Sequence, residues 1–477
     1  MISNNPFIHL FKTLGKYYVF DVNKNKILNI SEDLYRGLKK IKVGKSTENA
    51  KIKNLVDLGY FSSNKCKIIE HSEDIYLEDL LKNKLGAIIL QITQRCNFRC
   101  KYCVYSGNYH NRNHEDKNMK WDIAKRSLDF LLSNSKDSEK IQIGFYGGEP
   151  LLEFDLIKDC VDYAKKIFVG KKINFNLTTN GSILNNEIVE FLHNNNIQIT
   201  ISIDGPKIIH DKNRKFANNN LSTHDVILKN IANIRKKYPN YLSKININTV
   251  KDHECDVNEI NKYFSEEEIL KDLSKLNSDI SNDNRINPIN YEKDFFSNIE
   301  YEKFKVILSI IGRLKSDDDN IFEEYFSATM LTNNKLKFKQ NKILEKSHPS
   351  GTCIPGATKF LVNVNGDFFP CDMANEISNI LKIGNINDGF YINKIRKLMN
   401  PSKIISDECK NCYAFIYCDQ CVLKSVENNK FEDRLSRNKK LIKCMETRKE
   451  TEESFKDICT INELYKLKEE LKSDFNL

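Results

Sequence analysis

The sequence lacks any apolar run long enough to cross a membrane. A membrane-spanning helix needs about 20 consecutive apolar residues, and the nearest stretch, Leu85–Ile92, is short and interrupted by Gln91. The first residues, Met1–Lys16, also lack the apolar core and the small-residue cleavage site of a secretory signal. We therefore expect no membrane partner and a cytoplasmic location.

A dense block of basic residues and a repeat of the solenoid type are also missing. The net charge of +9 comes from 74 basic and 65 acidic residues that are spread along the chain. A dispersed excess of this size is typical of solvated surfaces and gives little support to nucleic-acid binding. We expect no nucleic-acid partner. With 477 residues, 40% of them apolar and 29% charged, the composition is that of a globular chain with about three domains.

Cysteine, by contrast, is abundant, with 14 residues in the chain. Disulfides are rare in the cytosol, so clustered cysteines there indicate metal ligands or catalytic groups. Ten of the 14 fall into two groups, one of three and one of seven. The other four are scattered and are interpreted as small buried or incidental residues, namely Cys66, Cys160, Cys255 and Cys459.

Between about residues 85 and 250, apolar strands alternate with helices. Strands are expected at 87–92, 141–146, 173–177, 197–203 and 245–250, with helices at 121–132, 154–168, 185–192 and 223–236. Near-continuous apolar strands that alternate with helices are typical of a parallel sheet built from βα units. The sequence therefore predicts an α/β fold, a partial (β/α)6 barrel of the TIM type.

The flanking regions differ from this barrel in composition. Residues 1–80 combine short strands with helices, and Ser31 is placed to cap the first helix, so a small winged-helix-like domain is expected there. The remaining divisions are expected to be the barrel at 86–300, a linker or helical bridge at 301–347, a cysteine-dense domain at 348–450 and a charged helical tail at 451–477.

The first cysteine group, Cys96, Cys100 and Cys103, follows directly on the first barrel strand. It therefore lies in a βα loop at the carboxyl end of that strand, where barrel active sites form. Three thiolates can hold three irons of a four-iron cluster and leave the fourth iron open to a small molecule. The alternative is a zinc site whose fourth ligand is His110 or His114.

The segment Cys96–Cys103, with the sequence CNFRCKYC, resembles the signature of the radical S-adenosylmethionine (SAM) superfamily. Each further motif alone fits an ordinary turn, but several on successive βα loops, in the family's order, are hard to reach by chance. The resemblance covers about residues 86–260. The further motifs are Gly147-Gly148-Glu149-Pro150, Thr178-Thr179-Asn180-Gly181, Ser202-Ile203-Asp204-Gly205 and, after them, Arg214.

This resemblance implies where SAM is held. The motif at 147–150 is expected to bind the SAM ammonium group, and Ser202 and Asp204 to lie near its ribose and carboxylate. Thr179 and Asn180 belong to the same expected binding surface, and Arg214 is suited to pair with a carboxylate. Tyr102 is similar to the residue that packs on the adenine, and no clear adenine-contact motif is evident on the fifth strand.

The implied chemistry proceeds by single electrons. A reduced 4Fe-4S cluster passes an electron to SAM, and the resulting 5′-deoxyadenosyl radical abstracts a hydrogen atom from the substrate. The cofactor performs the difficult step, while the protein supplies orientation and exclusion of water. The electron would come from a donor of the flavodoxin or ferredoxin type.

The seven cysteines between residues 353 and 444 resemble the SPASM domain of radical SAM maturases, which holds two auxiliary 4Fe-4S clusters. The total would then be three clusters. One spacing departs from the family: two residues rather than three separate Cys418 from Cys421. In isolation the run 409–421 also fits a zinc knuckle. The family's interleaved pattern gives the outer cluster Cys409, Cys412, Cys418 and Cys444, and the inner cluster Cys353, Cys371 and Cys421.

Two further resemblances bear on the substrate. Asp372 is similar to the catalytic base of anaerobic sulfatase-maturating enzymes, although a solvated or capping aspartate fits the position too. Residues 1–80 resemble a RiPP recognition element, the module that binds the leader of ribosomally made precursor peptides by adding a strand to a sheet edge. A structural cap or a DNA-binding wing fits the same pattern.

These resemblances predict a radical SAM peptide maturase that joins a carbon of a precursor peptide to a cysteine sulfur as a thioether. The inner set of three cysteines supports this, since an open iron can bind a substrate thiolate. Two enzymatic alternatives stay open: a formylglycine-forming dehydrogenase of the sulfatase-maturase type and a carbon–carbon crosslinking maturase. The non-enzymatic alternative is a zinc-dependent binding protein.

Metal analysis separates iron from zinc. Three four-iron clusters require about 12 irons and about 12 labile sulfides per chain, so we expect those contents in anaerobically reconstituted protein. Zinc without sulfide would contradict the cluster assignment and support the binding-protein alternative.

Overall fold

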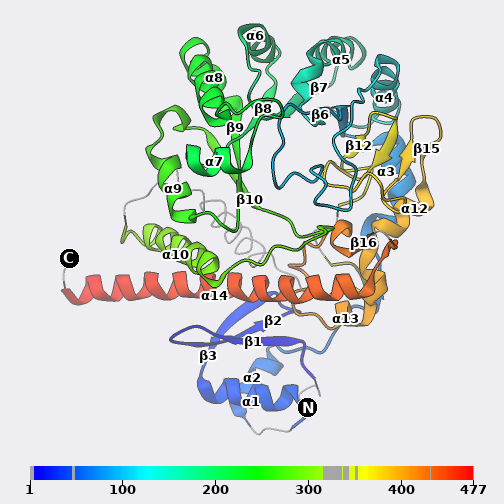
Figure 1. Cartoon of the computed structure of the whole chain (residues 1–477). Helices are drawn as coiled ribbons and strands as arrows, with labels where there is room; N and C mark the ends of the chain where they lie inside the picture. Colours follow the sequence, from blue (N-terminus) through cyan, green and yellow to red (C-terminus); the bar gives the residue numbers. More distant parts are fainter. Residues whose placement is uncertain are drawn as a thin grey trace.

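Six consecutive parallel strands form the barrel part of a sheet that has ten strands among the described residues (Figure 1). The computed structural model describes residues 5–45, 49–314, 336, 343–349, 353–429 and 431–475. Each strand pairs with the next one along the chain, so the predicted α/β fold and its partial barrel are confirmed. The strands are β5 (Ala87–Thr93), β6 (Lys140–Gly147), β7 (Lys172–Thr179), β8 (Gln198–Ser202), β9 (Ile245–Lys251) and β10 (Ser274–Asp279).

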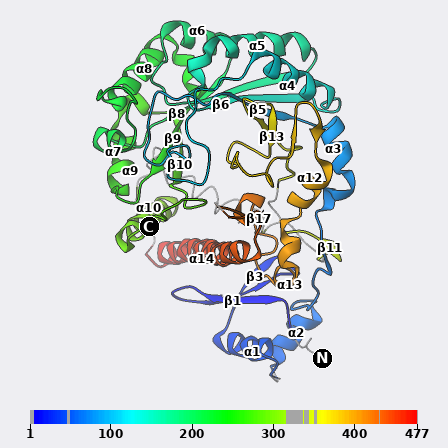
Figure 2. The ribbon, with the colours of Figure 1, turned by 45° about the vertical axis from the view of Figure 1, so that its right-hand side comes forward.

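Helices cover the outer side of these strands, and Figure 2 shows them as an arc around the sheet. They bury apolar faces against it, and Ile88, Leu128 and Ile157 are fully buried in the shared core. The helices are α4 (Trp121–Ser133), α5 (Phe154–Ile167), α6 (Asn186–Asn194), α7 (Lys207–Asn213), α8 (Thr223–Lys237) and α9 (Val257–Glu266).

The sixth strand, β10, lies in a region that the sequence indicated only as a polar end of the barrel. Its residues, SKLNSD, alternate without an apolar run. β10 is the edge strand and pairs only with β9, and its side chains are exposed or half-buried, so polar residues suffice there.

The C-terminal region continues the same sheet. Strand β12 (Phe360–Val362) pairs in parallel with β5, and β13 (Asp367–Phe369), β14 (Gly384–Asn385) and β15 (Gly389–Phe390) follow as antiparallel strands. The ring of Phe130 on α4 packs 5.1 Å from that of Phe368. The sheet therefore runs without a break from the barrel into the region that the sequence placed in a separate domain at 348–450.

The N-terminal region is a small unit of its own. An antiparallel sheet of β1 (Ile8–Lys12), β2 (Tyr17–Asp21) and β3 (Lys26–Ile30) packs on α1 (Glu32–Lys42) and α2 (Ala50–Asp57). Ser31 accepts a hydrogen bond from the backbone N–H of Leu34, as expected of an N-cap.

The long helix α14 (Arg437–Phe475) lies across the other face of this small sheet (Figures 1 and 2). The ring of Phe455 lies 4.7 Å from Phe20 and 5.0 Å from Tyr417, and all three are buried. At the sheet's edge, His9 stacks on Tyr413 with ring centres 3.6 Å apart. The N-terminal sheet is therefore attached to the C-terminal region rather than to the barrel strands.

The remaining elements connect these parts. Among the described residues, no helix combines the length and apolarity that crossing a bilayer requires. Most of the expected linker at 301–347 lies outside the described residues, although helix α10 reaches into it. The connecting elements are β4 (Ile68–Ile69), α3 (Leu77–Asn83), α10 (Lys293–Ile310), β11 (Lys346–Ser347), α12 (Ile392–Leu398), α13 (Ser406–Lys410), β16 (Val426–Asn428) and β17 (Asp433–Leu435).

The aromatic cluster predicts a stability effect. Replacing a buried phenylalanine by alanine typically costs about 3–5 kcal/mol, so Phe455→Ala should lower the free energy of unfolding by that order in urea titrations. Phe431→Ala is the matched control, because Phe431 is 86% exposed. Equal stability of the two variants would show that the cluster does not hold the N-terminal sheet.

Candidate active site

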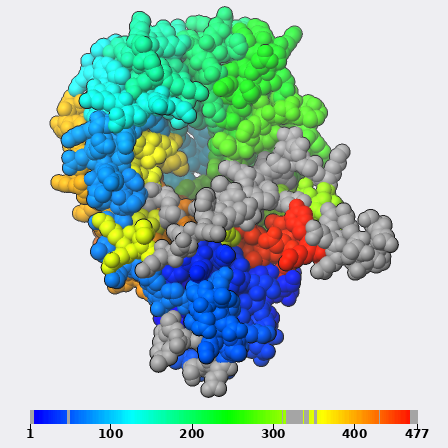
Figure 3. All heavy atoms as spheres, turned by 180° about the vertical axis from the view of Figure 1, so that it is seen from behind, coloured from blue at the N-terminus to red at the C-terminus, as the bar shows by residue number. Residues whose placement is uncertain are grey.

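A cavity of about 630 Å³ lies at the carboxyl ends of the parallel strands. The loops after β5, β6, β7 and β8 line one side of it, and residues 372–375 and 421–426 of the C-terminal region line another. Seen from behind, the molecule is hollowed between the green barrel end and the yellow C-terminal segment (Figure 3). Active sites of parallel barrels form at this end of the strands.

The first cysteine group faces this cavity. Cys96, Cys100 and Cys103 all line it. Burial raises the pKa of Cys96 and of Cys100 to about 12 and also raises that of Cys103, and neighbouring thiols of the group raise the first two further. The three thiols are thus close together and protonated at neutral pH, until a bound metal displaces their protons.

The described residues contain no ready site for a single metal ion at this place. In the described parts of the chain, no three side chains of His, Cys, Asp or Glu converge as ligands of one ion. A four-iron cluster does not require that, because each thiolate binds its own iron. His114 Nε2 lies 3.7 Å from Cys103 Sγ, and His110 lines the cavity, but neither completes a zinc site with the three cysteines.

Two glycines let the loop after β6 lie directly against the loop that leads into the cysteine group. A Cβ atom at Gly147 would stand 2.2 Å from the carbonyl oxygen of Thr93, and one at Gly148 would stand 2.0 Å from that of Arg95. Both distances are far below van der Waals contact, so only glycine fits at these positions. Both glycines line the cavity.

Glu149 is fully buried and joins two loops. Its carboxylate accepts hydrogen bonds from Thr179 Oγ1 at 2.8 Å, from the N–H of Asn180 at 2.7 Å and from the N–H of Leu151 at 3.1 Å. Burial raises its pKa to about 7, although these hydrogen bonds act to lower it. Its oxygens therefore hold Thr179 and Asn180 at the cavity wall.

The contact of Glu149 with the SAM ammonium group stays a prediction. Glu149 and the buried Pro150, which begins a short 3-10 helix, are not among the described residues that line the cavity.

A second buried carboxylate, Asp204, organises the loop after β8. Asp204 is fully buried and accepts hydrogen bonds from Arg214 Nε at 2.9 Å and Nη2 at 3.1 Å, and also from the Tyr102 hydroxyl. The predicted carboxylate partner of Arg214 is thus within the chain itself. Ser202, Arg214 and Tyr102 line the cavity, so the pair fixes the Tyr102 ring at its wall.

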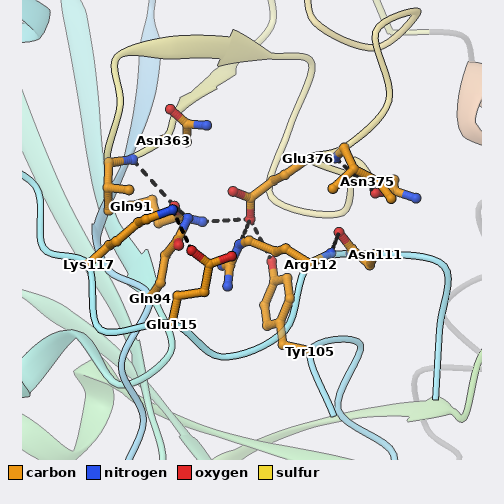
Figure 4. Close-up of polar contacts among 12 residues, drawn as sticks. Gln91, Gln94, Tyr105, Asn111, Arg112, Glu115, Lys117, Asn363, Asn375 and Glu376 are labelled. Atoms are coloured by element: carbon orange, nitrogen blue, oxygen red, sulfur yellow. Dashed lines mark hydrogen bonds and ion pairs between the residues drawn. The ribbon is translucent and has the colours of Figure 1, made fainter. Parts of the chain in front are cut away.

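A third buried carboxylate, shown in Figure 4, connects the cysteine loop with the C-terminal region. Glu376 is 2% exposed, and its Oε1 accepts hydrogen bonds from Gln91 Nε2 at 2.6 Å, Arg112 Nε at 2.9 Å and the Tyr105 hydroxyl at 3.1 Å. The Arg112 guanidinium also lies 3.8 Å from the centre of the Tyr105 ring. Tyr105 donates its only hydrogen to Glu376 and is itself one of the residues that line the cavity.

Sequence reasoning missed this network. Tyr105 comes two residues after Cys103, and that proximity to the motif was a usable signal. Glu376 and Arg112 gave none, because they lie in polar loops and become neighbours only in the folded chain.

Asp372 lines the cavity on the side of the C-terminal region. It forms an ion pair with Lys359, whose Nζ lies 3.0 Å from Oδ1. Burial raises the pKa of Tyr146, and the charges of Asp372 and Cys103 raise it further. Asp372 and Cys103 line the same cavity, and the role of Asp372 as a base stays a prediction.

The seven later cysteines gather into two sets. Burial raises the pKa of Cys353 and raises that of Cys371 to about 12, and the charge of Cys421 adds to both shifts. Cys421 also lines the cavity, whereas Cys353 and Cys371 are not among its described lining residues. These three cysteines are those that the family pattern assigns to the inner cluster.

The second set lies around the start of α14. Burial raises the pKa of Cys409 to about 12, that of Cys412 to about 11 and that of Cys418 as well, and the charge of Cys444 adds to all three. This set agrees with the predicted outer ligands. That either set holds a cluster stays a prediction.

The barrel matches a known protein family. Residues 90–264, which include the cysteine motif, the two glycines and the Asp204–Arg214 pair, match the family model of the radical SAM superfamily. The chain carries a radical SAM domain. Such a domain implies SAM and a 4Fe-4S cluster, and the three thiols in the cavity fit that cluster.

Two relatives are similar to this chain over about seven tenths of its length. A cysteine-type anaerobic sulfatase-maturating enzyme from Clostridium perfringens (strain 13 / Type A) is 28% identical over 70% of this chain and 87% of its own length. The radical SAM cyclopropyl synthase TigE from Paramaledivibacter caminithermalis is 25% identical over 72% of this chain and 69% of its own.

Among solved structures, native anSMEcpe with bound AdoMet has a TM-score of 0.58 and 23% identity. The match covers 79% of this chain and 99% of that one. It supports the fold, including the part beyond the barrel.

The buried ion pair of Glu376 with Arg112 predicts that the two residues are coupled in their effect on stability. Removing one partner of a buried ion pair costs about 3–5 kcal/mol because the other charge is left unpaired. Glu376→Ala should therefore lower the free energy of unfolding by that order.

A double-mutant cycle provides the control. Adding Arg112→Ala to Glu376→Ala should cost much less than the sum of the single changes, since no buried charge is then left over. Fully additive costs in urea unfolding would contradict the coupling.

Proposed function

We propose that this radical SAM protein is a maturase that oxidises the side chain of a cysteine or serine in a peptide substrate by two electrons. The observation that carries the proposal is the position of Asp372, which lines the same cavity as Cys96, Cys100 and Cys103. The sulfatase-maturating relatives, similar over most of their length, support this reaction over thioether formation.

The chain's own residues have definite parts in this reaction. When bound, SAM and the reduced cluster supply a one-electron oxidant that abstracts a hydrogen atom. Asp372 accepts the proton of the substrate thiol or hydroxyl, and Lys359, whose Nζ lies 3.0 Å from Oδ1, holds the carboxylate in place. Tyr105, held by its hydrogen bond to Glu376, forms part of the wall that would surround the peptide.

The balance of the reaction is as follows for a cysteine substrate. Its carbon loses a hydrogen atom, its sulfur loses a proton to Asp372, and one further electron would pass to an oxidised iron–sulfur cluster that the C-terminal cysteine sets would hold. The resulting thioaldehyde reacts with water to give an aldehyde and hydrogen sulfide. A serine substrate reaches the aldehyde directly.

Thioether formation is the second candidate. The set of Cys353, Cys371 and Cys421 has three thiols rather than four, and Cys421 lines the cavity. A cluster bound by three thiolates keeps one iron open for a substrate thiolate. A carbon–carbon link is a third product of the same initial radical.

The N-terminal sheet is the proposed binding site for the peptide leader. Helix α14 covers one face of this sheet, and α1 and α2 cover the other. Its edge strands are β1 and β3, and an extended peptide can add a strand to such an edge.

Asp372→Asn tests the reaction. It should lower the rate of product formation by about 10²–10⁴-fold, as expected when a general base is lost, while 5′-deoxyadenosine still forms. The matched control is Asp367→Asn, because Asp367 also pairs with a lysine, Lys382, at 2.6 Å but is not among the described cavity residues.

Mass spectrometry of a cysteine-containing peptide encoded beside this protein identifies the product. An aldehyde that reacts with a hydrazide, with sulfur replaced by oxygen, is expected. Loss of two hydrogens, with one cysteine resistant to alkylation, would establish the thioether instead. The same loss with every cysteine still alkylated would point to a carbon–carbon link.

A further inference from the structure

Lys440 is a lysine buried in the interior of the C-terminal region. It lies in the first turns of α14 and is 1% exposed. Its Nζ donates a hydrogen bond to Gln420 Oε1 at 3.2 Å, and no carboxylate among the described residues forms an ion pair with it. An ammonium group carries three donors, so this neutral acceptor does not account for its burial. Burying such a charge is costly unless an opposite charge compensates it.

The described groups near Lys440 include His348, Gln420 and cysteines of the outer set. Cys444 follows it by four residues, so the two side chains share one face of the helix. Burial raises the pKa of Cys409 and Cys418, and the charge of Lys440 acts on both in the opposite direction. The buried cation therefore faces thiols that become negative when they bind metal.

The same helix carries a second cation one turn beyond Cys444. The charge of Arg448 lowers the pKa of Cys412, against the larger effect of burial. The exposed Asp419 acts on Cys418 with the opposite sign, but water screens it. Two cations of α14, Lys440 and Arg448, thus act on the thiols of this set.

Gln420 and Thr447 hold the arrangement in place. Gln420 Nε2 donates a hydrogen bond to Thr447 Oγ1 at 3.0 Å. The other end of the same amide, Gln420 Oε1, accepts from Lys440 and lies 4.0 Å from Cys444 Sγ. Gln420, Thr447 and Lys440 are all buried, so protein contacts rather than solvent set the position of the Lys440 ammonium group.

We propose that Lys440 is the counter-charge of the outer cluster and raises its reduction potential, which makes this cluster the better electron acceptor. The inference rests on the outer cluster of the proposed function. Reduction adds one electron to a centre already surrounded by four thiolates. A fixed positive charge in a medium of low dielectric constant stabilises that reduced state more than the oxidised one. The electron that leaves the substrate would then find its acceptor here.

Potentiometric titration of the reconstituted holoenzyme, followed by electron paramagnetic resonance, tests the proposal. Lys440→Met keeps the volume of the side chain and removes the charge. The midpoint potential of one cluster should fall, by about 59 mV for each tenfold loss in the one-electron reduction equilibrium, while the other midpoints stay unchanged.

Two variants serve as controls. Lys440→Arg keeps the charge and should keep the midpoint close to that of the wild type. Lys439→Met removes a neighbouring lysine whose Nζ instead donates to the carbonyl oxygen of Val426 at 2.7 Å, and it should leave all midpoints unchanged.

Unchanged midpoints in a fully loaded Lys440→Met variant would overturn the role of Lys440 alone. Loss of the cluster in both Lys440→Met and Lys440→Arg would also overturn it, because a retained charge would not have rescued the site. Loss only in Lys440→Met would support it. A wild-type chain that holds only about four irons would overturn the outer cluster itself, and the iron and sulfide contents distinguish that failure from the others.

Discussion

The site depends on one buried ion pair, that of Glu376 with Arg112. It joins strand β5, the loop that carries the cysteine motif and the C-terminal loop after Asp372. Both side chains are buried, so separating them would leave each charge unpaired away from water, which favours one arrangement of the two loops. The base of the proposed reaction and the thiols of the radical SAM domain are therefore positioned by the same contact, although more than 250 residues of sequence separate them.

Three buried carboxylates each hold loops in place around the cavity. Glu149 joins the loops after β6 and β7, Asp204 fixes Arg214 and Tyr102, and Glu376 joins the cysteine loop to the C-terminal region. In each case the loop geometry is fixed by hydrogen bonds to a group that solvent does not reach. Loops held in this way are preorganised, so binding of a substrate need not order them.

Much of this was readable from the sequence because it depends on local pattern. The apolar strands, the Ser31 cap and the cysteine motif after β5 are properties of short segments, and the structure places them as predicted. β10 was missed because an edge strand with polar residues carries no apolar period. Glu376 and Lys440 were missed because their importance comes from burial beside partners remote in sequence, which spacing does not encode.

The pairing of β12 with β5 has a consequence for the integrity of the chain. Without the C-terminal region, β5 would become an edge strand, and its sequence AIILQIT would expose unpaired backbone groups beside apolar side chains. Such edges recruit strands from other molecules. A fragment cut before residue 348 would therefore be prone to self-association. The C-terminal region thus protects the β5 edge of the barrel sheet in addition to contributing the later cysteines.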